Sequence, residues 1–331
     1  MKKIFFAIAA VAALAACSKS EVAYEQGNEI SLAPVPQNMT KTMMTGESFL
    51  TTESFNVWAW YKQLAAGTEV AEWQADATED QLYIPEKPFE YREGTNWGGV
   101  TPYYWPKLGS LLFAGYYPTD IAENVEYVFD AENNKMVFTG IEQTWVADYE
   151  EGEEDYTEDI MYFNMTASSS ASGPVAVVFK HALSWITVNV LKSEDSPKIV
   201  IDEIKFTKVN PEGTGTVNGA EVISWATTGT AAATVVGEDV ELEETATKLV
   251  EPLFIPQTMA GDLVITYTVY SSETEKFTET YTAALSELKD DLDTWAPAKH
   301  YIYNIEIGTS EILIAPTVED WEEVEVPVLV E

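Results

Sequence analysis

The sequence has few of the side chains on which most site chemistry depends. It contains one cysteine, two histidines and one arginine. A single cysteine forms neither an internal disulfide nor a cysteine zinc site, and two histidines leave little room for a histidine metal site or a catalytic triad. Basic residues are also scarce, with 18 Lys+Arg against 55 Asp+Glu and a formal net charge of −37. Such a chain repels nucleic acid and anionic membrane surfaces, so we expect neither as a direct partner.

Long apolar runs are absent except at the beginning of the chain. Residues 4–16 form an apolar run behind a basic Met1–Lys3, and this run is shorter than the about 20 residues that span a bilayer. Its length is that of a secretory signal, and it ends in small residues before Cys17. The pattern resembles the bacterial lipobox, whose cysteine is acylated. We therefore expect a signal peptide over 1–16, lipidation at Cys17 and anchoring at the outer membrane, with a plain secretory signal as the alternative.

The rest of the chain is dominated by alternating apolar and polar residues. The clearest examples are the segments 55–61, 186–190, 265–270 and 301–307, rich in β-branched and aromatic residues. Period-2 alternation is typical of half-buried strands. Turn residues separate the segments, at 97–99, 210–213 and 260–262, and only residues 284–292 suggest a short helix. The pattern predicts an all-β protein built of antiparallel sandwiches that are soluble beyond the anchor.

A stretch of small residues at 167–173 suggests a domain boundary. It divides the chain after the signal into halves of about 150 residues, a normal domain size. A surface loop within one domain is the alternative. The expected organisation is a signal peptide (1–16), a tether and first strand (17–45), an N-terminal sandwich (46–172) and a C-terminal sandwich (173–331).

Six short motifs in order resemble those of the fimbrillins, the subunits and fimbrillin-like lipoproteins of Bacteroidetes-type pili. They are Phe113–Pro118 with Asp120, Asp159–Tyr162, Phe179–Ser184, Ile255–Gln257, Trp295–Ile305 and Val318–Trp321. The resemblance implies two tandem transthyretin-like β-sandwiches and a non-enzymatic role in a surface pilus, without a cofactor. It also implies polymerisation by strand exchange. Proteolysis removes the first strand of the N-terminal domain, and the C-terminal segment of a neighbouring subunit replaces it.

Two residues depart from the family pattern. Well-known members are cut after an arginine in the N-terminal segment, whereas the only arginine here is Arg92. Lys41 is the nearest basic candidate for a processing site, and the alternatives are a different protease or no processing. Ala298 stands where the family usually has glycine, so we expect Pro297-Ala298 to form a turn other than the type II turn of a Pro-Gly pair.

The last residues of the chain alternate without interruption. Val324, Val326, Val328 and Val330 share one face of the segment 324–331. Such a strand can add to an open sheet edge, and Pro327 restricts it to an edge because proline donates no hydrogen bond. The segment is therefore a candidate donor strand for another pilus subunit. The alternative is that it closes its own domain.

Aromatic residues suggest a second function. Trp97, Tyr103, Tyr104 and Trp105 lie in a turn-rich stretch and are candidate contacts for a host or glycan ligand. The alternative for these rings is core packing. A surface glycan-binding lipoprotein is therefore the second reading of the sequence.

Other polar features point to no enzyme. Seven acids between 149 and 159 lack the spacing of a calcium loop, so a solvated surface loop is preferred to a cation site. His181 and His300 lie in strand-like apolar segments and are expected to be structural. We expect a fimbrillin-like stalk, anchor or tip subunit that supports adhesion.

Overall fold

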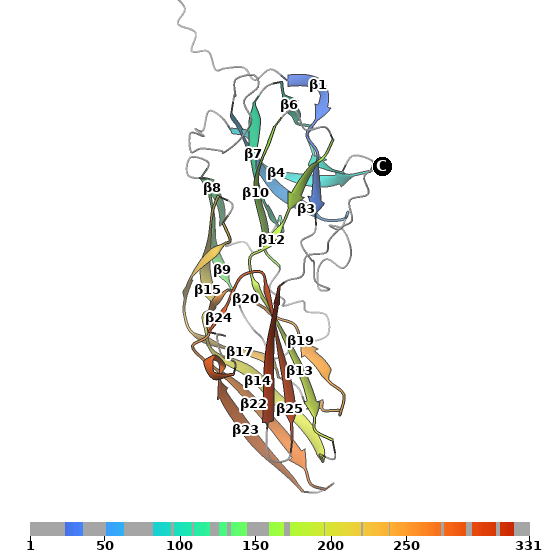
Figure 1. Cartoon of the computed structure of the whole chain (residues 1–331), viewed down its shortest axis with the longest axis vertical. Coiled ribbons are helices and arrows are strands. Elements are labelled where there is room, and N and C mark those ends of the chain that lie inside the picture. Colours follow the sequence, from blue (N-terminus) through green and yellow to red (C-terminus); the bar gives the residue numbers. More distant parts are fainter. Residues whose placement is uncertain are drawn as a thin grey trace, which may run out of the picture.

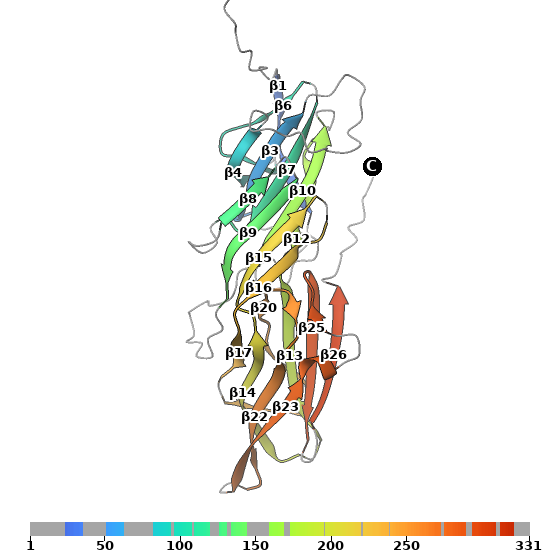
Figure 2. The same ribbon diagram turned by 90° about the vertical axis from the view of Figure 1, so that its left-hand side faces the viewer.

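The computed structural model describes most of the chain from residue 24 to residue 320. The described ranges are 24–35, 51–62, 82–93, 96–107, 109–119, 126–130, 134–143, 159–168, 173–194, 196–219, 221–237, 239–272, 275–288, 293–308 and 312–320. Within them the chain is almost entirely β-strand, and the sheets form an elongated molecule (Figures 1 and 2). The expectation of an all-β fold is confirmed. None of the helical segments in the described part is long and apolar enough to cross a membrane.

The largest sheet has eight strands and forms one end of the molecule (Figure 1). Its order is β11 (Val175–Val178), β2 (Leu32–Val35), β5 (Asn96–Gly99), β4 (Leu82–Arg92), β3 (Ser54–Lys62), β7 (Ser110–Tyr117), β10 (Met161–Ser168) and β12 (Lys180–His181). The sheet curls, so β11 also approaches β10, and it encloses a core that includes Phe55, Phe163 and Phe179. A separate ribbon pairs β1 (Tyr24–Glu29) with β6 (Tyr104–Pro106).

A four-stranded sheet covers the opposite face of β3, β7 and β10. Its order is β16 (Ser224–Thr228), β15 (Glu212–Asn218), β9 (Lys135–Glu142) and β8 (Glu126–Asp130). Between the two sheets lies a second core that contains Trp58, Phe138 and Tyr162. Strand β7 is buried along its whole length because apolar cores lie on both of its faces. The β15–β16 hairpin follows the predicted boundary at 172/173, but β15 pairs with β9, which precedes that boundary. Segments from both sides of the boundary therefore share this sheet.

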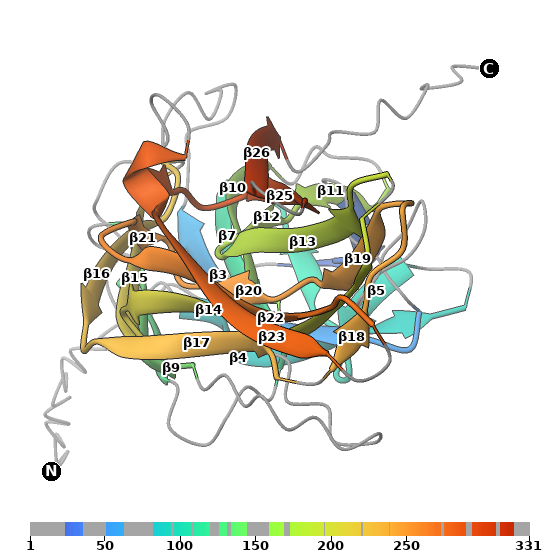
Figure 3. The ribbon, with the colours of Figure 1, turned by 90° about the horizontal axis from the view of Figure 1, so that it is seen from below.

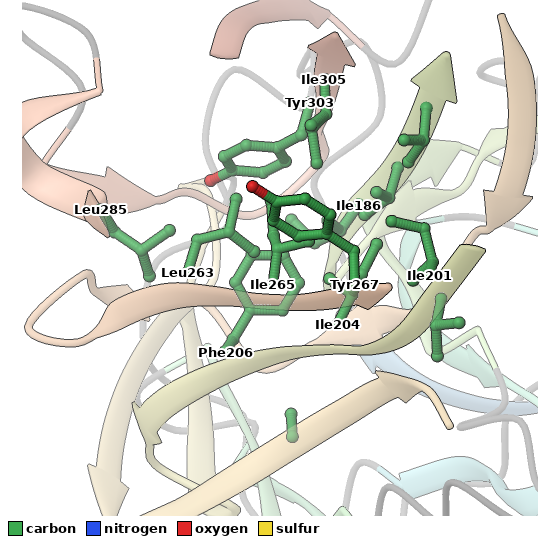
Figure 4. Packing of buried hydrophobic residues seen from close by; sticks show 14 of the residues in the cluster. Ile186, Ile201, Ile204, Phe206, Leu263, Ile265, Tyr267, Leu285, Tyr303 and Ile305 are labelled. Carbon is green, nitrogen blue, oxygen red and sulfur yellow. The ribbon is translucent and has the colours of Figure 1, made fainter. Parts of the chain in front are cut away.

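The other end of the molecule is a sandwich of two five-stranded sheets. The first has β19 (Thr247–Val250), β13 (Ser184–Lys192), β25 (Lys299–Ile307) and β26 (Ile312–Asp320), with β20 (Leu253–Phe254) also on β13. The second has β17 (Ala231–Val236), β14 (Lys198–Val209), β22 (Asp262–Tyr270) and β23 (Lys276–Ala284), with β18 (Val240–Glu241) also on β14. Figure 3 shows the two layers from below, and Figure 4 shows the aliphatic and aromatic side chains packed between them. A short ribbon of β21 (Gln257–Thr258) and β24 (Thr294–Trp295) adds to this end.

Buried amide side chains join the two ends of the molecule. Gln143, which follows β9, donates from Nε2 to the carbonyl of Leu253 at 3.2 Å and accepts from the backbone N–H of Ile255 at 2.8 Å. Gln257 accepts from the N–H of Asn210 at 2.7 Å and donates to its carbonyl at 3.3 Å. These side-chain amides replace a neighbouring strand as hydrogen-bond partners. They satisfy backbone groups of Leu253, Ile255 and Asn210.

Three local expectations differ from the structure. Residues 97–99 form strand β5 rather than a turn, because their glycines allow close contacts: a Cβ on Gly99 would lie 2.9 Å from the Thr101 carbonyl. The expected helix at 284–292 is represented by one 3₁₀ turn, Leu285–Glu287, in the described residues. Ala298 has φ +54°, the left-handed conformation usually adopted by glycine, which the expectation of a different turn assumed that alanine would avoid. The Ala298 N–H donates to the Leu183 carbonyl at 2.9 Å, which holds the strained residue in place.

Candidate functional site: the β2 seat

Strand β2 lies between two strands that do not pair with each other. It pairs in parallel with β11, with Leu32 opposite Val175, and in antiparallel fashion with β5, where Leu32 is opposite Trp97. The Ser31 carbonyl accepts a 2.9 Å hydrogen bond from the Val175 N–H. In the described part of the chain, β11 has no sheet partner other than β2. We call the slot between β5 and β11 the β2 seat; it would have an open strand edge on both sides if β2 left.

Alternate residues of the first segment point into the core beneath the seat. Ile30 and Leu32 have no exposed surface, and Pro34 is also buried. Full burial of an aliphatic side chain stabilises by about 1.5–3 kcal/mol. Pro34 is tolerated because β5 begins at Asn96, so the pairing with β5 at Leu32 does not extend to Pro34 and no donor is needed there. The segment is held mainly by apolar contacts of alternate side chains, a form of binding that another alternating strand can reproduce.

An ion pair fixes the beginning of the seated segment. Arg92 Nη1, at the end of β4, lies 2.5 Å from Glu29 Oε1, at the end of β1, and the two side chains are 30% and 36% exposed. The pair lies over β5 at Gly98, where a Cβ would be only 3.4 Å from the Glu29 carboxylate. One residue further on, the Ile30 N–H donates to the Tyr103 carbonyl at 2.7 Å. No sequence pattern indicates this pair, because Arg92 and Glu29 are distant in the chain and the seat is formed by the fold.

The four aromatic candidates are not on one exposed surface. Trp97 and Trp105 are 5% and 1% exposed and belong to the core of the large sheet, where Trp105 packs edge-on against Phe113. Tyr103 is half-buried, and Tyr104 is 37% exposed with its carbonyl accepting from the Tyr83 hydroxyl. The two indoles pack in the core, which was the alternative given for these rings, because aromatic rings of this size fill the curled sheet. Ligand contact by this stretch stays a prediction, with Tyr104 as its exposed member.

Both histidines are buried and have defined partners. His181 Nδ1 lies 2.7 Å from Asp159 Oδ2, which joins the end of the large sheet to the segment before β10. His300 Nε2 lies 2.8 Å from Thr187 Oγ1, and its ring stacks on Trp185 with centroids 3.3 Å apart. Burial, followed by the charge of Lys248, lowers the pKa of His300 to about 4, so the ring is neutral at pH 7. These contacts describe packing and cross-strand bonding.

Several predicted positions lie outside the described residues. They are the lipidation site Cys17, the candidate processing site Lys41, the acids at 150–158 and the candidate donor residues Val324, Val326, Val328 and Val330. Among the residues that are described, no cluster of three or more histidine, cysteine or acidic side chains has the arrangement of a metal site.

Sequence comparison places the protein in a class and then in a family. Residues 1–18 match the prokaryotic membrane lipoprotein lipid attachment site, which together with the sheets above defines an exported cell-surface lipoprotein of β-sandwich type. Residues 40–321 match the fimbrillin-like family, and the chain belongs to that family. It is a family of structural and adhesion proteins, not of enzymes. The comparison with curated protein sequences gives no match.

Three of the solved structures of similar fold come from Bacteroides species. A fimbrial protein of Bacteroides vulgatus is 15% identical, with a TM-score of 0.59 over 88% of this chain and 99% of that chain. A candidate cell adhesion protein of Bacteroides ovatus is 14% identical, with a TM-score of 0.53 over 92% and 100% of the two chains. One of Bacteroides uniformis is 15% identical, with a TM-score of 0.50 over 88% and 98%. At these identities the likeness establishes the fold alone.

Proposed function

We propose that this protein is a fimbrial subunit that joins a neighbouring subunit by strand exchange at the β2 seat and so supports adhesion. The observation that carries the proposal is the position of β2, which among the described strands is the one that links β11 to the rest of the large sheet. Leu32 of β2 and Ile30 just before it are fully buried, so the vacated seat would expose an apolar groove between two open strand edges. A stalk, anchor or tip position in the fibre is compatible with this joint.

The exchange has two steps. A protease cuts the chain after β2, with Lys41 as the candidate site six residues beyond the end of the strand at Val35. The C-terminal segment 324–330 of another subunit, identical or different, then displaces β2. Three of its alternating valines would occupy the core positions of Ile30, Leu32 and Pro34. The net charge of −37 keeps subunits soluble and apart until such a strand is offered.

Limited proteolysis of the chain that begins at Cys17 tests the proposal. We expect a cut between Thr40 and Thr52, followed by ladders of oligomers on native gels, with mass spectrometry to locate the cut. Deletion of 324–331 should abolish the ladder. A trimmed chain that remains monomeric at high concentration would refute the proposal.

A second variant separates the seat from another open edge. Strand β23 is the last strand of its sheet in the described structure, and its Phe277 is 49% exposed. Phe277→Lys should prevent association through β23 but leave exchange at the β2 seat unchanged. Loss of the ladder in this variant would place the joint at β23 instead.

A further inference from the structure

The seated segment has an acid directly before its first core residue. Glu29 carries the ion pair with Arg92, and Ile30, Leu32 and Pro34 then point into the core at every second position. The ion pair and the apolar residues therefore lie at fixed distances along the seat. A strand that enters the seat in the direction of β2 must satisfy both to be held equally well.

The C-terminal segment contains the same pattern. Glu325 precedes Val326, and Val328 and Val330 follow at the same spacing of two. We infer that Arg92 is the register-determining residue of the seat, pairing with Glu29 in the free subunit and with Glu325 of the incoming subunit after exchange. This inference rests on the proposed function, since it requires that the segment enter the β2 seat.

Pro327 decides between the two registers that place an acid beside Arg92. With Glu325 in the place of Glu29, Pro327 takes the place of Ser31, whose observed bond to β11 uses the carbonyl, a group that proline keeps. With Glu323 in that place, Pro327 instead replaces Ala33, which lies inside the parallel ladder opposite Ala176. A proline inside a ladder removes a donor, so the register set by Glu325 is preferred.

The composition of the chain makes the pair selective. Arg92 is the only arginine, and a guanidinium binds a carboxylate through two parallel donors where geometry allows. A strand shifted by one residue would place Pro327 and Leu329 on the core face and a valine beside Arg92. Because both side chains of the present pair are about one-third exposed, the pair contributes modestly to affinity and more to register.

Peptide capture by the trimmed chain tests the inference. The chain is cut after β2 with the resident strand still seated, and a labelled peptide of residues 321–331 is offered. Glu325→Gln in the peptide should weaken capture about fivefold, as expected for a partly exposed ion pair. Glu323→Gln in the same peptide is the matched control and should change capture by less than about twofold.

The same peptides on an Arg92→Gln chain complete the cycle. On the Arg92→Gln chain, the Glu325→Gln peptide and the unchanged peptide should be captured equally well. On the unchanged chain, the difference in capture between the two peptides should become smaller at high salt. Equal effects of Glu325→Gln and Glu323→Gln, or a loss that persists with Arg92→Gln, would overturn the inference and leave strand exchange intact. If the unchanged peptide is not captured at all, the proposed function itself fails. Comparing peptides on one chain cancels any effect of Arg92→Gln on folding.

Discussion

Substitution of Leu32 measures how strongly the seat holds its resident strand. The Leu32 side chain has no exposed surface and belongs to the core of the large sheet. Leu→Ala at such a site leaves a cavity and costs about 3 kcal/mol. Since about 1.4 kcal/mol corresponds to a factor of ten, Leu32→Ala should release the trimmed resident strand about a hundredfold more readily.

The assay follows displacement of the resident strand by the 321–331 peptide. Ser31→Ala is the matched control, because Ser31 is half-buried and its observed bond to Val175 uses a backbone carbonyl that alanine retains. In the Ser31→Ala control, the rate of displacement of the resident strand should stay within about twofold of the rate in the unchanged chain. The reasoning fails if the resident strand is displaced at the same rate in the Leu32→Ala and Ser31→Ala chains while Leu32→Ala still lowers the free energy of unfolding of the uncut chain in urea.

Four further substitutions test packing, hydrogen bonding and backbone strain in other parts of the fold. Gly115→Ala should destabilise by about 3 kcal/mol in urea unfolding, because the new Cβ would lie 2.2 Å from the Phe163 ring; an unchanged midpoint would contradict the packing. Gln143→Ala should cost about 2 kcal/mol by leaving buried backbone groups unpaired, whereas exposed Glu142→Ala should be near neutral. Ala298→Gly should stabilise by about 0.5–1 kcal/mol by relieving the φ of +54°, and a lower Tm would show that no strain is relieved. The pKa of His300 is lowered from 6.5 to about 4 in the folded protein. Folding stability from this group is therefore complete above pH 6.5 and is lost as the pH falls toward 4. His300→Gln should reduce the difference between the Tm at pH 7 and the Tm at pH 4.

Alternation in the sequence predicted the strands that have one face in a core and one face outside it. The segments at 186–190, 265–270 and 301–307 fall within β13, β22 and β25. These strands are readable because burial on one face alone produces a period of two. The segment at 55–61 falls within β3, which was also predicted although apolar cores lie on both of its faces. The same rule is less informative for β7, which is buried on both faces.

Pairing between distant segments was not predictable from local pattern. Strand β2 contains Pro34 and is followed by Pro36, in a segment expected to form a tether and a first strand. Its pairing with β11, far along the chain, was not indicated. The hairpin of β15 and β16 likewise reads as part of the C-terminal half but pairs with β9. The local sequence of either strand does not identify its partner, because strand pairing depends on which strand edges the rest of the fold brings close.

Arg92 illustrates how a scarce residue gains meaning from position. In the sequence its only significance was negative, since it lies too far along the chain to be the expected processing site. In the fold it contacts the acid that begins the seated segment, and the surrounding chain offers no second arginine with which to confuse the register. A strongly acidic protein has acids in almost every segment, so an acid alone specifies little. An acid followed by three apolar residues at spacings of two, beside a single guanidinium, specifies a strand, its direction and its register together.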